Sequence, residues 1–288
     1  MTPLASAVEG WSPGPVTTTA RIGAGPAAAF AALLDQPAPP LADGDPLPPG
    51  WHGFSFLDHP ATADLGEDGH PRAGHFLPPL PHRRRMIAGG RLEVTAPLRV
   101  GAVVERTSSL ARCEVKAGRS GEMLLVTVRS EHREEGRLLV TEEQDVVYRS
   151  QAGGSSPAPA GPGTPAPADD GPGVELRPDE ALLFRFSALT YNAHRIHYDR
   201  PYATGVEGHP GLVVHGPLLA LLLLEVPRRH VPDRAVVSFT HRLTRPAFAG
   251  TPVRAGGRAD GDRLELSAAA VGQPSSITGT ALLTGGAR

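Results

Sequence analysis

The residues best suited to acid–base chemistry lie together in one short segment, from Tyr191 to Asp199, which reads YNAHRIHYD. Histidine titrates near neutral pH, so His197 could move a proton to or from carbon or water. Asn192 does not ionise, but its amide could hold a water molecule or a carbonyl oxygen. The segment therefore indicates a site of proton transfer.

A second polar point, His215-Gly216, stands eighteen residues beyond His197 and directly before an apolar run, Pro217–Val226. If that run is a helix, the backbone N–H of Gly216 lies at its start. The first N–H groups of a helix have no partner within the helix, and the helix dipole favours negative charge there. Such a donor could stabilise an oxyanion. Together, the Tyr191–Asp199 segment and His215-Gly216 indicate proton transfer beside a polarised carbonyl.

The segment Leu212–Val226 is hydrophobic on all sides over about three turns, which predicts a buried helix. A shorter helix is expected at Asp179–Ala188. Strand-like runs follow the apolar segment, and a sheet around one buried helix would cover the apolar surfaces of both. These expected strands are Val236–Leu243, Thr251–Arg258, Arg263–Ala270 and Thr278–Leu283.

The N-terminal part has a related organisation. A helix is expected at Ala27–Leu34, and the Pro-, Gly- and His-rich passage Gln36–Pro81 should hold little regular structure. Period-two alternation then predicts an antiparallel meander, within which Cys113 reads as a small buried apolar residue. The expected strands are Arg91–Ala96, Val103–Glu114, Gly121–Glu131 and Leu138–Arg149.

The two parts are separated by Gln151–Gly173, where 17 of 23 residues are Pro, Gly or Ala. No large apolar side chain is present to offset the entropy of ordering, so the segment predicts a linker. It divides the chain into 1–150 and 174–288.

Composition excludes several classes of function. With 28 Lys and Arg against 30 Asp and Glu, the net charge of −2 gives no field that would attract nucleic acid. The longest apolar run contains Glu225 and is short of the ~20 residues that a membrane span needs. One cysteine excludes an intrachain disulfide and a cysteine-built metal site, and no signal-peptide pattern begins the chain. We therefore expect a cytoplasmic protein with neither a membrane nor a nucleic-acid partner.

The two polar points also carry a family resemblance. FSALTYNAHRIHYDRPYA (Phe186–Ala203) and GLVVHGPLLALLL (Gly211–Leu223) resemble the hydratase motif of MaoC-like, hotdog-fold acyl-thioester hydratases and dehydratases. LPPGWHGFSFLDHP (Leu47–Pro60) and PPLPHRRRMIAGGRLEV (Pro78–Val94) are similar to the double-hotdog branch that contains mesaconyl-CoA hydratases and hydroxyacyl-thioester dehydratase type 2. The resemblance covers most of the chain outside the linker.

The resemblance implies an α+β fold of two hotdog domains, each an antiparallel sheet around a central helix. The first domain is then chemically degenerate and the second carries the site. The reaction would be reversible addition of water to an enoyl thioester, with His197 as acid/base and the Gly216 N–H as oxyanion donor. Asn192 stands where the general family has an Asp and would orient water or the carbonyl; His194 stands where that family has an Asn.

The same resemblance implies no metal and no cofactor beyond the CoA or phosphopantetheine of the substrate, which would be an acyl-CoA or an acyl carrier protein. A monomer or a homodimer would both be compatible. His194 and His215 are candidates for substrate binding. Arg84 and Arg85, in the basic run that starts at His82, could meet substrate phosphates or could form a solvated turn.

Two other readings remain open. Because an amide cannot act as a general base, Asn192 is also compatible with a non-catalytic protein that binds acyl thioesters. A hotdog thioesterase, or a dehydratase of a specialised biosynthetic pathway, would use a similar scaffold.

Asp199-Arg200-Pro201 most simply predicts the capped start of a helix, independent of catalysis.

Overall fold

The computed structural model describes residues 4–36, 41–80, 84–118, 121–149, 166 and 171–285. Most of the predicted linker 151–173 therefore lies outside the described residues, as do His82 and Arg83. No helix among the described residues is long and apolar enough to cross a lipid bilayer.

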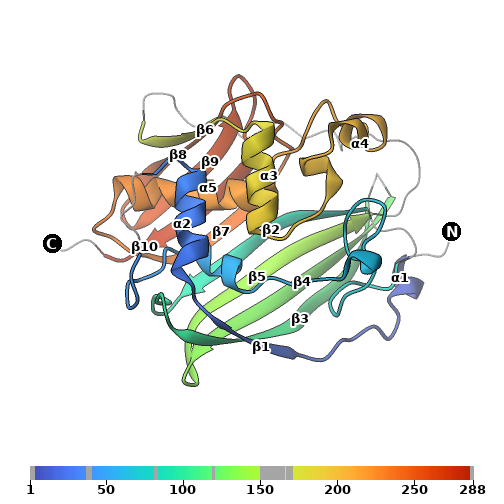
Figure 1. The fold of residues 1–288 in the computed structure, drawn as a ribbon, viewed down its shortest axis with the longest axis horizontal. Coiled ribbons are helices and arrows are strands. Elements are labelled where there is room, and N and C mark those ends of the chain that lie inside the picture. The colour runs from blue at the N-terminus through green and yellow to red at the C-terminus, as the bar shows by residue number, and fades with distance from the viewer. Residues whose placement is uncertain are drawn as a thin grey trace.

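The strands form one antiparallel sheet in the order β1-β3-β4-β5-β2-β7-β10-β9-β8-β6 (Figure 1). They are β1 (Val16–Arg21), β2 (Arg84–Val94), β3 (Val103–Gly118), β4 (Gly121–Glu134), β5 (Arg137–Arg149), β6 (Gly173–Leu176), β7 (Val236–Leu243), β8 (Val253–Asp260), β9 (Arg263–Ala270) and β10 (Ile277–Leu283). The first five strands come from the N-terminal part and the last five from the C-terminal part. The expected double hotdog is confirmed, with its two sheets joined edge to edge.

The helices lie mainly in the C-terminal part. They are α1 (Leu4–Ala7), α2 (Ala24–Leu33), α3 (Glu180–Leu189), α4 (Arg200–Gly205) and α5 (Gly216–His230), with the 3-10 turns η1 (Trp51–Ser55), η2 (Thr62–Asp64) and η3 (Arg195–His197). Within the described part of the N-terminal half, the longest helix is α2, with ten residues. The long central helix α5 belongs to the C-terminal half.

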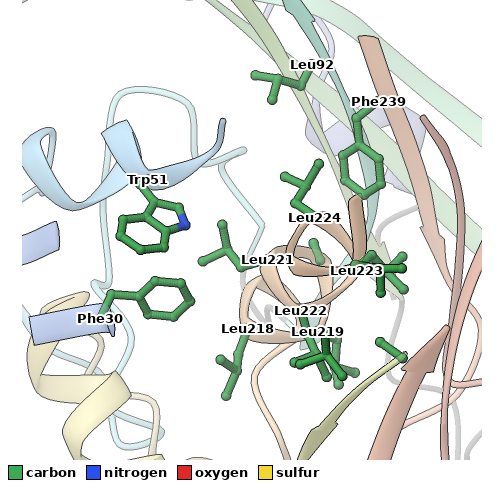
Figure 2. Close-up of a cluster of buried hydrophobic side chains, with 14 of the residues drawn as sticks. Phe30, Trp51, Leu92, Leu218, Leu219, Leu221, Leu222, Leu223, Leu224 and Phe239 are labelled. Carbon is green, nitrogen blue, oxygen red and sulfur yellow. The ribbon is translucent and has the colours of Figure 1, made fainter. Parts of the chain in front are cut away.

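Helix α5 begins at Gly216, with Pro217 in its first turn, where the missing proline N–H costs nothing. Ten consecutive residues, from Leu218 to Pro227, are buried. The helix packs against β6–β10, and Figure 2 shows its leucines directed toward both Phe239 of the sheet and Phe30 of α2. Each fully buried leucine contributes about 1.5–3 kcal/mol of hydrophobic stabilisation, so the predicted core helix is confirmed.

The two halves meet both within the sheet and among the elements that cover it. In the sheet, β2 pairs with β7 from Gly89 opposite Arg242 to Glu93 opposite Ser238. Gly89 lies so close to β7 that an added Cβ would stand 2.3 Å from the carbonyl oxygen of His241. On the covered face of the sheet, α2 packs beside α3 (Figure 1).

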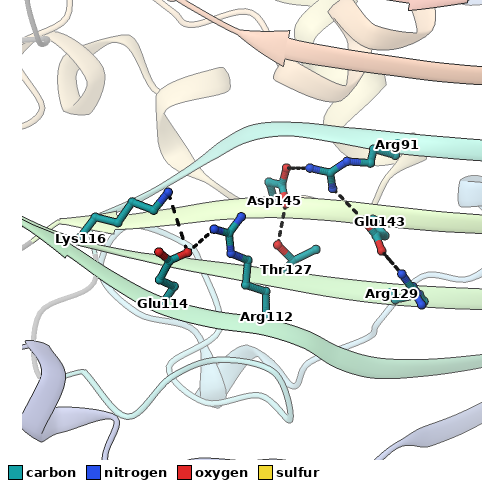
Figure 3. Close-up of polar contacts among 8 residues, drawn as sticks. All are labelled: Arg91, Arg112, Glu114, Lys116, Thr127, Arg129, Glu143 and Asp145. Atoms are coloured by element: carbon teal, nitrogen blue, oxygen red, sulfur yellow. Dashed lines mark hydrogen bonds and ion pairs between the residues drawn. The ribbon is translucent and has the colours of Figure 1, made fainter.

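The face of the N-terminal strands that points away from α5 is polar. Arg91 contacts Glu143 at 2.7 Å and Asp145 at 3.3 Å, and Arg129 contacts the same Glu143 at 2.6 Å (Figure 3). Their neighbour Leu92 is 5 % exposed and faces the core. This inside–outside alternation is the period-two pattern from which the meander was predicted.

Several boundaries differ from the prediction. β7 and β9 match it residue for residue, but β2 begins at Arg84 instead of Arg91, and the short edge strands β1 and β6 were missed. The prediction that Cys113 is buried was wrong, because this cysteine is exposed. β1 pairs with β3 only as far as Ser108, so Cys113 lies on a stretch of β3 that β1 does not cover.

Candidate active site

His197 ends the 3-10 turn η3 and is 7 % exposed. Its Nδ1 lies 2.7 Å from the carbonyl oxygen of Val213. Since a carbonyl only accepts, Nδ1 carries the hydrogen and Nε2 keeps a free lone pair. Burial lowers the pKa of His197 to about 4. At neutral pH this residue is therefore a neutral imidazole of fixed tautomer whose Nε2 can accept a proton.

The His197 ring is stacked on His215, with ring centroids 3.7 Å apart and planes inclined by 17°. His215 is the N-cap residue of α5, and its Nε2 is 2.9 Å from the hydroxyl of Ser187 on α3. Burial lowers its pKa well below the ordinary value, so this ring is also neutral. The stack places the imidazole of His197 next to the residue that precedes Gly216.

Gly216 is the first residue of α5, so its N–H is among those without a partner inside the helix. A Cβ at this position would stand 2.7 Å from Cδ1 of Leu243 on β7. The absence of a side chain therefore allows the helix start to approach the sheet closely. The structure thus brings the three candidate residues His197, His215 and Gly216 together.

Asn192 lies in the turn between α3 and η3. Its backbone N–H donates to the carbonyl of Ser187 at 2.8 Å, and its side-chain Oδ1 accepts from the backbone N–H of His194 at 3.0 Å. The side-chain oxygen thus closes an Asx turn, which is a structural role. The side-chain NH₂ remains as the part of Asn192 suited to hold water or a carbonyl oxygen.

Arg195 and Asp199 hold this segment in shape. The guanidinium of Arg195 donates to Asp199 from both Nε (2.9 Å) and Nη2 (2.8 Å) and lies 4.1 Å from the ring centre of Tyr202. Asp199 also accepts from the N–H of Tyr202 as the N-cap of α4, with Pro201 in the first turn. The predicted capped helix start is confirmed.

His194 faces residues of the other half. The centroid of its ring lies 3.8 Å from the ring centroid of His70 and 5.4 Å from that of His197. The Nδ1 of His70 is in turn 2.9 Å from Oδ2 of Asp68. Asp68 and His70 were not among the predicted site residues, because they lie in the irregular Gln36–Pro81 passage, about 125 residues before His194. The only local signal is the DGH tripeptide itself.

Of the predicted basic residues, Arg85 is half-buried at the start of β2. Its positive charge is among the causes that lower the pKa of His70, after burial, and it has the same effect on His194, after burial and the two neighbouring imidazoles. For Arg84, the structure gives only its backbone pairing with Arg149 on β5.

Two groups of described residues have three potential ligand atoms within 4.8 Å of one another: His52, His132 and Glu142 on the N-terminal half, and Asp68, His70 and His194. Spacing alone does not select a metal, because within each group a histidine already contacts the carboxylate, at 3.2 Å for His52 and 2.9 Å for His70. The second group could therefore take part in proton transfer without a bound metal ion.

A hollow of about 280 Å³ lies elsewhere, across the junction of β2 with β7. It opens on the polar face of the sheet, and none of the predicted site residues lines it. Its lining includes Arg91, Asp145, Thr240, His241, Glu265 and Thr280. The histidine cluster, on the α5 side of the sheet, is the better candidate for the reacting groups.

Comparison with known proteins finds relatives over most of the chain. The family model for hydroxyacyl-thioester dehydratase type 2 matches residues 50–249. The chain is 46 % identical over 260 residues to mesaconyl-C(4)-CoA hydratase of Chloroflexus aurantiacus, covering 90 % of this chain and 91 % of that protein. It is 43 % identical over 79 residues to the mitochondrial hydroxyacyl-thioester dehydratase type 2 of Schizosaccharomyces pombe, covering 27 % of this chain and 26 % of that protein.

Solved structures show the same fold. A MaoC-like dehydratase of Phytophthora capsici superimposes with a TM-score of 0.68 at 14 % identity, over 96 % of each chain. HtdX of Mycobacterium tuberculosis gives a TM-score of 0.63 at 18 % identity, over 93 % of this chain and 98 % of that chain.

Proposed function

This chain belongs to the hydroxyacyl-thioester dehydratase type 2 family, whose reaction interconverts a 3-hydroxyacyl thioester with an enoyl thioester and water, and from that premise we propose its substrate and the roles of its residues. The substrate is a CoA thioester of a short unsaturated dicarboxylic acid. The similarity to mesaconyl-C(4)-CoA hydratase over nine tenths of the chain supports this proposal. Arg85, half-buried at the start of β2, has the charge to meet the free carboxylate or a CoA phosphate.

In the dehydration direction, His197 Nε2 removes the proton from Cα. The bond from Nδ1 to Val213 supports this role, because it leaves Nε2 unprotonated and fixes the plane of the ring. As the Cα–H bond breaks, negative charge moves to the thioester oxygen. The N–H of Gly216, at the positive end of α5, stabilises that charge in the transition state.

Asn192 orients the reacting water or the thioester carbonyl through its side-chain NH₂, and His194 and His215 shape the site around the acyl group. His215 stacks on His197 and is held by Ser187, so it also keeps the catalytic ring in place. The observation that carries the proposal is the hydrogen bond from Nδ1 of His197 to Val213, which fixes one tautomer of a ring stacked on the N-cap residue of the buried helix.

The experiment is a mass-spectrometric screen of the purified full chain against enoyl- and 3-hydroxyacyl-CoA thioesters, including unsaturated dicarboxylic ones. A change of 18 Da is expected with the wild type and not with His197→Asn, while both proteins keep the same thermal unfolding midpoint. His75→Asn, at an exposed histidine that contacts Gly14 instead, is the matched control. Full turnover by His197→Asn would contradict the assignment.

One observation favours a second function. The side-chain oxygen of Asn192 closes a turn, and the family resemblance implies a carboxylate at this position; an amide there suits a protein that binds acyl thioesters without converting them. Saturable binding of an acyl-CoA without an 18 Da change would support that alternative. Release of free CoA, detected by a thiol reagent, would instead indicate a thioesterase.

A further inference from the structure

The segment around Asn192 contains no carboxylate available for catalysis. Asn192 itself is an amide, and its oxygen is held by the His194 N–H. Asp199 is occupied by Arg195 and by the cap of α4. A hydration site needs a group that takes a proton from water and returns it, in addition to the group that acts at Cα. The C-terminal half supplies His197 for one of these tasks.

A segment of the N-terminal half is fixed against the same loop. The backbone N–H of Arg195 donates to the carbonyl of Asp68 at 2.9 Å, and its Nη1 donates to the carbonyl of Glu67 at 3.0 Å. Gly69, with φ of +85°, approaches so closely that an added Cβ would stand 1.8 Å from the carbonyl oxygen of Ala193. The contact therefore requires glycine and leaves no room for the two loops to slide.

This contact brings a carboxylate–imidazole pair to the site. Both oxygens of Asp68 accept from His70, one from its backbone N–H and one from its ring Nδ1, each at 2.9 Å. Burial opposes ionisation of Asp68, but the hydrogen bonds from His70 outweigh it and hold its pKa at about 2. With Nδ1 bound to a charged carboxylate, Nε2 of His70 is left to exchange a proton, and the ring lies 3.8 Å from His194.

We propose that Asp68 and His70 form the second acid/base group of the active site, supplied by the N-terminal half to act on the oxygen at Cβ. The inference rests on the proposed function. In this arrangement both halves contribute reacting groups, whereas the resemblance alone assigned chemistry to the second half. Asp68 stabilises the imidazolium of His70 in the way that a buried carboxylate stabilises a catalytic histidine.

The proton balance of dehydration is then complete. Nε2 of His197 takes the Cα proton, and the electron pair of the Cα–H bond is delocalised onto the thioester oxygen before it forms the double bond as the Cβ–O bond breaks. Burial lowers the pKa of His70, and the hydrogen bond to Asp68 opposes that shift. In its protonated form, Nε2 of His70 gives a proton to the departing hydroxyl, which leaves as water. A proton returns from His197 to His70, with solvent or His194 between them, and hydration runs the same steps in reverse.

The test uses two leaving groups. A 3-hydroxyacyl-CoA must have its oxygen protonated, whereas a 3-chloroacyl-CoA loses chloride and needs only removal of the Cα proton. We expect His70→Gln and Asp68→Asn to lower kcat for the 3-hydroxy substrate by about 10²–10⁴-fold. The same variants should keep kcat for the 3-chloro substrate within about threefold of wild type. His197→Asn should lose both reactions.

Controls separate acid/base chemistry from other roles. Asp64→Asn and His75→Asn, at exposed positions of the same passage, should behave as wild type. Equal losses with both substrates, or unchanged turnover of the 3-hydroxy substrate, would overturn the proposal. So would activity that EDTA abolishes and Zn²⁺ restores, since the pair would then hold a metal. A wild type inert toward every thioester would instead refute the proposed function.

Discussion

Replacing Gly69 by alanine tests the contact between the two halves at the active site. The new Cβ would stand 1.8 Å from the Ala193 carbonyl oxygen, so the loops must separate. Separation breaks the hydrogen bonds from Arg195 to Asp68 and Glu67, at about 0.5–1.5 kcal/mol each. The left-handed backbone costs alanine a further ~1–2 kcal/mol. We expect a total loss of about 2–5 kcal/mol in the free energy of unfolding.

Gly136→Ala is the matched control. Gly136 has φ of +80°, almost the value of Gly69, but an added Cβ there meets nothing within 4 Å. It should pay the backbone cost alone, so urea titrations should show Gly69→Ala to be less stable by about 1–3 kcal/mol. Because the shift displaces His70, hydration should also slow by at least tenfold in Gly69→Ala only. Equal stability and equal activity of the two variants would refute the contact.

Two further predictions follow from burial in the C-terminal half. Burial lowers the pKa of His197 to about 4 in the folded protein, against about 6.5 in the unfolded chain. The unfolded state therefore binds more protons below pH 6.5. At pH 5 this one group lowers the free energy of unfolding by about 2 kcal/mol relative to neutral pH. Urea titrations at pH 7 and pH 5 should show a smaller difference for His197→Gln than for wild type, and an identical difference would contradict the burial of that ring. Leu222, at 0 % exposure in α5, should lose about 2–5 kcal/mol on truncation to alanine, measured against the exposed Leu282→Ala, and similar small losses for both would show that α5 is not the core.

Regular elements with strong periodicity could be predicted from the sequence. Phe239 and Leu243, four residues apart in β7, turn one face of that strand to the core, and the run of leucines in α5 has no polar face to expose. The short strands were missed for a physical reason. β1 reads VTTTAR, with three exposed positions in a row, because it lies at the edge of the sheet and carries no apolar face.

The candidate residues His197, His215 and Gly216 come from one stretch of the C-terminal half, and the structure places them together at the start of α5. Asp68 and His70 were not predictable in this way, because their position depends on a backbone contact between residues more than 120 apart. Gly69 permits that contact by lacking a side chain, and a missing side chain leaves no periodic pattern.

Because β2 pairs with β7 within one chain, the two halves associate intramolecularly. Two separate subunits would associate according to their concentration, and identical subunits would have to repeat every residue in both copies. In a single chain the partner strand is always present, so association does not depend on concentration. The sequence of each half can also change without the same change in the other half. The asymmetry of this molecule, with its long helix in one half and a docked loop in the other, is what such freedom permits. We therefore expect the protein to bind one substrate molecule per chain.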